Sequence, residues 1–328
     1  MEKTRGNYPS ILREIALFAS AALISTGILV WVLRLWQADL RVPFHYADDA
    51  LFHTMLIKGI MENGWSFQNA FIGMPTGQTL YDFPIPENLH ILGLKLLVLC
   101  THNVALTLNL YYLLSFPLTT LCALYVFRKL RISSLPAVVA SLLFTFLPYH
   151  FLRGVDHLFL AAYFLVPFAI LLSVWVCFDQ DLLLQRTAEG KTRINFISGK
   201  TRLALIACVL LGSIGGYYAF FSCFFILLAG IFGLTWYKDA ARVRTGIILC
   251  EIIAFTLILN ALPNVYLALA HGSNHAAILR PRISGECFPL KVTQLVLPAT
   301  GHRLPSFAAL KSEYNDAAPL VNENDFST

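Results

Sequence analysis

Titratable side chains are concentrated at residues 45–53, whose sequence is HYADDALFH. Two adjacent carboxylates, Asp48 and Asp49, stand between His45 and His53. A carboxylate can take a proton from a hydroxyl group as a general base, and carboxylate and imidazole groups are also common metal ligands. The residue types therefore permit acid–base chemistry here, or a metal site formed by His45, Asp49 and His53.

This segment leads into a predicted helix at residues 50–63, which Gly64 is expected to end. Asp48 or Asp49 would be its N-cap, because the helix dipole favours an ionised carboxylate there. A capping role is the structural alternative to a catalytic one. We expect the helix to be amphipathic and to lie at a membrane interface. Its apolar face would include Leu51, Met55, Ile60 and Met61.

The composition of the chain is that of a membrane protein. Of its 328 residues, 57% are hydrophobic and 13% are charged. The charged fraction is about half that of a typical soluble domain. Apolar runs recur that are long enough to span a bilayer, so we predict an all-α, polytopic bundle of transmembrane helices. The net charge of +5 does not indicate a nucleic-acid partner, because the basic residues gather in short segments between the apolar runs.

The apolar runs predict about seven transmembrane spans. The first, from about residue 15 to 36, is too long for a signal-peptide core and is interpreted as an uncleaved signal anchor. The run 203–237 is too long for one span, and Gly215-Gly216 would divide it into two short helices that meet at residues 215–218. The shorter apolar segment 88–100 is expected to be interfacial or re-entrant. The remaining spans are predicted at residues 104–127, 135–149, 157–178 and 246–270.

Basic residues fix the predicted orientation. The segments 1–13, 128–134, 179–202 and 238–244 contain 14 of the 24 Lys and Arg residues and would all lie on one side of the bilayer. The positive-inside rule assigns this side to the cytoplasm. We therefore predict a multi-pass protein of the plasma (inner) membrane, with a cytoplasmic N-terminus and an extracytoplasmic C-terminal tail.

With this topology, four polar clusters fall on the outer side, and ionisable groups at a membrane surface are candidates for function. Each has a structural alternative. Arg153 and Asp156 could pair to fix a loop, tyrosines often anchor helices at the interface, and the histidines after the last span could be solvated. Besides segment 45–53, the clusters are Tyr149, His150, Arg153, Asp156 and His157; Tyr217 and Tyr218; and His271, Asn274 and His275.

Two regions are expected along the chain. Residues 1–270 would form the transmembrane domain, with a first outer loop at residues 37–103. Residues 271–328 would form an extracytoplasmic tail without a closing span. We interpret that tail as the start of a further loop or domain that is cut short.

The predicted topology and several short motifs resemble the GT-C superfamily of polytopic membrane glycosyltransferases. YADDALFH opens the first outer loop, and PYHFLRGVDHLFLAAYFLVPFAILL and GGYYAFF are similar to bacterial membrane proteins of the YfhO-like type. The resemblance implies transfer of a sugar from a polyprenyl-phosphate carrier, on the outer face of the membrane, to a glycan, lipid or protein acceptor. It also implies contact with membrane lipids.

The resemblance also implies roles for particular residues. Family members carry an acidic residue in the first outer loop as general base or metal ligand, so Asp49, or its neighbour Asp48, is expected to be catalytic. The same pair is where Mg²⁺ or Mn²⁺ would bind if a divalent cation takes part. Arg153 and His157 would bind the donor phosphate, because a fixed cation stabilises a leaving phosphate. Tyr217, Tyr218 and His53 complete the expected substrate-binding residues.

Two other functions remain open. A transporter or flippase of lipid-linked sugars would be expected to have ionisable or polar residues in mid-span, where Glu251 and Asn260 are the candidates. A non-catalytic membrane scaffold would leave the outer polar clusters dispensable and far apart. The enzyme hypothesis instead expects Asp48 and Asp49 to border one cavity with the clusters at residues 153–157 and 217–218.

Overall fold

The computed structural model describes residues 11–83, 85–179, 182–186, 192–272, 292–298 and 300–317. Within these ranges the chain is all-α, apart from two short antiparallel hairpins. These are β1 (Gln68–Asn69) with β2 (Gln78–Thr79), and β3 (Leu184–Arg186) with β4 (Thr192–Ile194). Asn274, His275 and most of the expected tail lie outside the described residues.

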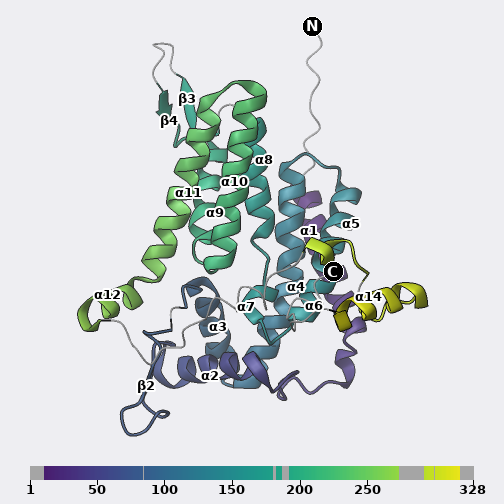
Figure 1. Ribbon diagram of the computed structural model, residues 1–328, viewed down its shortest axis with the longest axis vertical. Coiled ribbons are helices and arrows are strands. Elements are labelled where there is room, and N and C mark those ends of the chain that lie inside the picture. The colour runs from purple at the N-terminus through teal and green to yellow at the C-terminus, as the bar shows by residue number, and fades with distance from the viewer. Residues whose placement is uncertain are drawn as a thin grey trace.

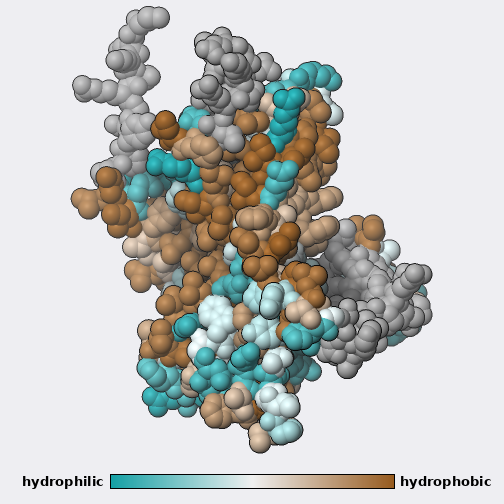
Figure 2. All heavy atoms as spheres, turned by 90° about the vertical axis from the view of Figure 1, so that its left-hand side faces the viewer, coloured by the Kyte–Doolittle hydropathy of each residue, from teal (hydrophilic) through white to brown (hydrophobic). Residues whose placement is uncertain are grey.

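Among the described residues, five helices are long and apolar enough to cross a membrane, which suggests a multi-pass membrane protein. Much of their apolar surface faces outward, as it does in proteins surrounded by lipid. Figure 2 shows a broad apolar region between hydrophilic groups towards the two ends of one face. The five are α1 (Ile11–Val32), α4 (Val104–Lys129), α5 (Ser134–Thr145) together with α6 (Pro148–Arg153), α10 (Gly216–Tyr237) and α11 (Ala240–Asn260).

Two predicted spans are shorter than expected. The run 157–178 forms two helices, α7 (Leu158–Ala161) and α8 (Val166–Phe178), because Pro167 favours a new helix start and leaves residues 162–165 between them. The run 203–237 does break before Gly216, as predicted. Its halves are unequal, however: α9 (Gly199–Leu211) has 13 residues and α10 has 22.

The helices stand side by side and share two ends (Figure 1). α1 begins at one end, where the β3–β4 hairpin and the turn between α10 and α11 also lie. The opposite end, which we call the distal end, carries α2 (Asp48–Asn63), α3 (Asn88–Thr101), α6 and α7. Shorter elements complete the described chain: η1 (Leu35–Gln37), α12 (Leu262–His271), η2 (Val292–Leu295) and α14 (Pro305–Ala317).

The basic segment 238–244 is mostly helical rather than a loop. α11 begins at Ala240, and the Asp239 side chain caps it by accepting a hydrogen bond from the Ala241 N–H. Arg242 is 3% exposed, and its guanidinium donates a hydrogen bond to the Cys177 carbonyl at the end of α8. This arginine therefore joins α11 to α8 instead of lying in water.

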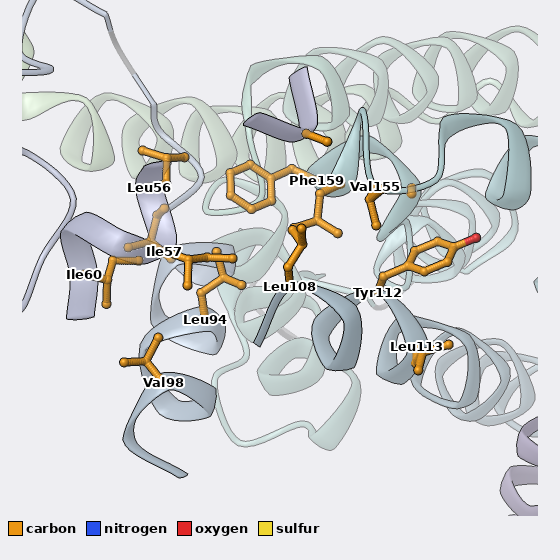
Figure 3. Packing of buried hydrophobic residues seen from close by; sticks show 14 of the residues in the cluster. Leu56, Ile57, Ile60, Leu94, Val98, Leu108, Tyr112, Leu113, Val155 and Phe159 are labelled. Atoms are coloured by element: carbon orange, nitrogen blue, oxygen red, sulfur yellow. The ribbon is translucent and has the colours of Figure 1, made fainter. Parts of the chain in front are cut away.

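α2 packs into the core with its inner face, which differs in part from the expected one. Figure 3 shows Leu56, Ile57 and Ile60 of α2 facing Leu94 and Val98 of α3. Met55 and Met61 are partly buried against this cluster, but Leu51 is 42% exposed and does not belong to the packed face. The helix ends as predicted, at Gly64 in a left-handed conformation.

The predicted N-cap of α2 is wrong. The N-cap is Ala47, which offers no side-chain hydrogen bond, and both Asp48 and Asp49 lie inside the first turn. A carboxylate in the first turn still gains from the helix dipole. Neither aspartate is the N-cap, so what remains of the structural explanation is this interaction with the dipole.

Candidate functional site

A cavity of about 340 Å³ lies at the distal end, between α2, α7 and the start of α10. It contains five of the seven residues that the sequence singled out: Asp49, His53, His157, Tyr217 and Tyr218. These come from three separate regions of the chain. The rest of its lining is Phe52, Phe83, Glu87, Phe159, Leu160, Ile214 and Gly215.

Asp49 and His157 lie close together in this cavity and form an ion pair when the imidazole is protonated. The distance from His157 Nδ1 to Asp49 Oδ2 is 3.4 Å, and the two side chains are 24% and 65% exposed, respectively. α2 holds Asp49 in its first turn, while His157 is the residue just before α7. A carboxylate beside an imidazole nitrogen is an arrangement that can orient the ring and move a proton.

A second pair lies directly beside the first. His45 Nε2 is 3.3 Å from Asp156 Oδ1, and Asp156 precedes His157 in the chain. The segment 45–49 therefore contacts residues 156–157 twice. In one contact it supplies the histidine, and in the other it supplies the aspartate. We call the four side chains His45, Asp49, Asp156 and His157 the two-pair wall.

Asn109 of α4 holds the chain that leads to this wall. Its side-chain amide donates hydrogen bonds to the carbonyl oxygens of Leu40 and Val42, at 2.9 and 2.7 Å. Its carbonyl oxygen accepts from the Phe44 N–H at 3.1 Å. Because Asn109 is fully buried, these bonds fix the loop just before His45.

Asp48 lies elsewhere. Its side chain is 86% exposed and does not line the cavity, and its nearest charged partner is His45, at 4.0 Å. Asp48 has a φ of 45°, outside the right-handed helical region, so its side chain does not follow the helical turn that directs Asp49 into the cavity. Of the two expected catalytic carboxylates, the structure brings only Asp49 into the site.

His53 lines the cavity as a neutral group. Its side chain is buried, and Nδ1 donates a hydrogen bond to the Asp49 carbonyl at 2.8 Å. Burial lowers the pKa of His53 to about 4, because the imidazolium would lose its hydration. Its ring also meets Phe159 edge-on, with centroids 4.9 Å apart. At neutral pH His53 can therefore exchange hydrogen bonds with a hydroxyl, but it supplies no positive charge.

Glu87 is a cavity residue that the sequence reasoning missed. It precedes α3, and a Cβ atom on Gly215 would lie 2.7 Å from its Oε1 atom. Burial raises the pKa of the Glu87 carboxyl to about 7. A signal was present in the sequence, since Glu87 is the acidic residue in PIPENLH, directly before the short apolar segment 88–100.

Asparagine side chains hold Glu87 in place. Asn88 donates a hydrogen bond to Asn260 Oδ1 at 2.9 Å, and Asn260 donates in turn to the Gly212 carbonyl at 3.2 Å. The Leu89 N–H donates to the Ser213 carbonyl at 3.0 Å. These bonds join the start of α3 to the break between α9 and α10, where Gly215 lies.

The remaining expected residues divide into those inside and those outside the cavity. Tyr217 is 62% exposed, and the Tyr218 hydroxyl donates a hydrogen bond to the Leu160 carbonyl. Arg153 does not line the cavity; its guanidinium carbon lies 5.6 Å from the centroid of the Tyr149 ring. His271, at the end of α12, is exposed and also lies outside the lining.

Within the described residues, no three His, Cys, Asp or Glu side chains come close enough together to hold a metal ion. The divergence of Asp48 from Asp49 is one reason. Comparison of the chain with protein-family models, curated proteins and solved structures gave no match.

Proposed function

We propose that this chain is a multi-pass membrane glycosyltransferase of the GT-C type. It would transfer a sugar from a polyprenyl-phosphate carrier to an acceptor hydroxyl on the outer face of the membrane. The observation that supports this most is the Asp49–His157 pair, at 3.4 Å, in a cavity at the distal end of apolar helices. A lipid-borne phosphate and a water-side hydroxyl can both reach such a position.

The proposed topology has seven crossings, two of them short. α8 and α9 stand beside the longer α10 and α11, so each can complete a crossing with the residues that flank it (Figure 1). The distal end would then be extracytoplasmic, and the end where α1 begins would be cytoplasmic. The basic residues support this orientation, since most of the described Lys and Arg residues lie near that second end.

In the proposed reaction, the acceptor hydroxyl oxygen attacks the anomeric carbon of the sugar. The new C–O bond forms as the bond between that carbon and the carrier phosphate oxygen breaks, and the bonding electrons leave with the phosphate. Asp49 takes the hydroxyl proton as general base, a role that typically contributes about 10²- to 10⁴-fold. His157 holds the Asp49 carboxylate in position through its Nδ1 atom.

Other cavity residues would bind the substrates. The Tyr217 and Tyr218 hydroxyls are at the start of α10, beside Gly215. A protonated Glu87 can donate a hydrogen bond to a sugar or phosphate oxygen, and its raised pKa keeps a fraction of it protonated near pH 7. Arg153 lies over the Tyr149 ring outside the cavity lining, so it would act on the phosphate only through the longer-range effect of its charge.

A divalent cation such as Mg²⁺ or Mn²⁺ fits the described residues poorly. Asp49 and Asp48 would be its expected ligands, but their side chains do not share the cavity. No third ligand joins them within the described part of the chain. The proposed step is therefore derived from the side chains of the protein alone.

The transporter and scaffold hypotheses make different predictions about particular residues. For a transporter, Asn260 was a candidate relay, but its side chain is engaged in the hydrogen bonds that hold α3 against the α9–α10 break. For a scaffold, the polar clusters would be expected far apart, whereas Asp49, His157 and Tyr218 line one cavity. Both observations favour the enzyme.

Membranes that contain the full chain would be incubated with short polyprenyl-phosphate donors carrying radiolabelled glucose, mannose, galactose or N-acetylglucosamine. The proposal expects label in an acceptor from at least one donor, and none in membranes that lack the chain. Failure to transfer any of the four sugars, with the protein present at normal level, would contradict it.

A further inference from the structure

A second cavity, of about 400 Å³, lies on the other side of the two-pair wall. His45 and Asp156 line this cavity, whereas Asp49 and His157 line the first. The four residues of the two-pair wall are thus divided between the linings of the two cavities. The rest of the second lining is Leu33, Leu35, Ala38, Phe44, Tyr112, Phe151, Leu152, Gly154 and Val155.

The second cavity is apolar except where it meets the wall. Its lining offers few polar side chains, and the Tyr112 hydroxyl among them donates to the His150 carbonyl at 3.5 Å. His45 Nε2 and Asp156 Oδ1 are 3.3 Å apart, yet neither atom has a hydrogen bond and both are shielded from water. Buried polar atoms without hydrogen bonds are costly and are commonly satisfied by a ligand or a water. Here they could serve one hydroxyl, which donates to the carboxylate oxygen or accepts from the imidazole.

The position of this cavity favours a ligand that comes from the bilayer. Leu33 and Leu35 belong to the stretch where α1 ends, and Trp31 and Trp36 in the same stretch are 72% and 61% exposed. Exposed tryptophans at the end of an apolar helix are typical of the membrane–water interface. A polysaccharide would need many hydrogen-bonding partners, which this lining does not provide.

We propose that this second cavity binds a hydroxyl-bearing lipid, with its apolar part among the leucines and phenylalanines and its hydroxyl at the His45–Asp156 pair. The inference rests on the proposed function and deepens it, because it makes the sugar acceptor a lipid. For transfer, the acceptor hydroxyl leaves the His45–Asp156 pair and moves to Asp49 in the first cavity, which the donor occupies.

Binding can be tested without any sugar donor. The full chain, in lipid nanodiscs, would be irradiated with a dioctanoylglycerol that carries a diazirine in one acyl chain, and labelled peptides would be mapped by mass spectrometry. Unlabelled dioctanoylglycerol and its methyl ether, which lacks the hydroxyl, would serve as competitors. Ala38→Trp would obstruct the exposed rim of the cavity, and the neighbouring Gln37→Trp, outside the lining, is its matched control.

The proposal expects label in the peptides containing residues 33–38 and 151–156. It expects Ala38→Trp to reduce this label about tenfold and Gln37→Trp to leave it unchanged. The methyl ether should compete about tenfold less well than the alcohol, which corresponds to one lost hydrogen bond. Label spread evenly over the lipid-facing helices, or unaffected by Ala38→Trp, would overturn the proposal. Equal competition by the ether would overturn the role of the His45–Asp156 pair.

These outcomes are separate from those of the sugar-transfer assay. Specific labelling without transfer from any donor would leave the lipid site standing and remove its role as an acceptor site. Transfer without specific labelling would retain the glycosyltransferase and place its acceptor elsewhere.

Discussion

His157 Nδ1 lies 3.4 Å from Asp49 Oδ2, and this contact joins two parts of the chain that are 108 residues apart. The neighbouring His45–Asp156 pair, at 3.3 Å, repeats the contact with the two residue types exchanged. The Asp49–His157 pair lines a cavity with several polar side chains, and the His45–Asp156 pair lines one whose other side chains are apolar except for Tyr112. Asp49 lines only the first of these cavities, so the proposed transfer would bring the sugar and the acceptor hydroxyl together there.

Gly215 should be the least replaceable residue of the glycine break. Its φ of 113° and ψ of 161° form a conformation that only glycine adopts readily, and an added Cβ would meet Glu87. Gly215→Ala is expected to lower the free energy of unfolding by about 1–3 kcal/mol from backbone strain alone. Gly216→Ala is the matched control, because a Cβ there meets nothing within 4 Å. Thermal unfolding in detergent would measure both, and equal melting temperatures would contradict the account.

His53 should make the protein less stable in acid. Its pKa in the folded chain is about 4, compared with an ordinary value of 6.5, so the unfolded chain binds the additional proton. The contribution of neutral His53 to stability is therefore complete above about pH 6.5 and is lost as the pH falls towards about 4. As the pH falls from about 6.5 to about 4, the melting temperature of wild type should fall relative to that of His53→Gln. His102→Gln, at an exposed histidine, controls for general acid effects. A constant difference would argue against a buried, neutral His53.

Glu87 should have the opposite pH dependence. Its folded pKa of about 7 lies above the ordinary 4.5, so the folded chain holds the proton more tightly and stability falls as the pH rises from about 4.5 to about 7. Glu87→Gln keeps the shape and removes the charge. We expect the melting temperature of Glu87→Gln, relative to that of wild type, to rise between about pH 4.5 and pH 7 and to stay constant above pH 7. A difference in melting temperature between the two proteins that does not change with pH would show that Glu87 is not desolvated.

Asn260 should be structural. Its side chain bonds Asn88 and the Gly212 carbonyl, so Asn260→Ala leaves partly buried polar groups unpaired, at a cost of about 1–3 kcal/mol. Glu251→Gln, at an exposed position on the same helix, is expected to have little effect on the melting temperature. A transporter would instead require one of these residues for ion-driven movement of a lipid-linked sugar into vesicles. Such uptake by wild type, lost in Asn260→Ala at normal protein level, would favour the transporter.

Periodicity and composition predicted most of the helical architecture, because spans and glycine breaks are local properties of the sequence. The end of α2 at Gly64 and the break before Gly216 were both readable in this way. The interruption between α7 and α8 was not, because the run 157–178 is uniformly apolar and only Pro167 marks the new start. Among the described residues five helices are long enough to span a membrane, so the two short crossings of the predicted seven stay a prediction.

The site depended more on tertiary structure. Asp49, rather than Asp48, faces the cavity because Asp48 has a φ of 45° where α2 begins, a local conformation that the sequence could not fix. Glu87 escaped notice because a single acidic residue before a helix is common. Its importance appears only when Gly215, far along the chain, is brought against it and Asn260 against its neighbour Asn88.

The most direct test of the account compares Asp49→Asn with Asp48→Asn in the sugar-transfer assay, at matched protein levels. The two variants remove the same charge at adjacent residues, but only Asp49 lines the cavity and contacts His157. We predict that Asp49→Asn lowers transfer about 100-fold or more, as expected for a general base, and that Asp48→Asn stays near wild type. His157→Gln should also lower transfer, and combining it with Asp49→Asn should add little further loss. Undiminished transfer by Asp49→Asn, or equal losses in the two aspartate variants, would contradict the central role of the Asp49–His157 pair.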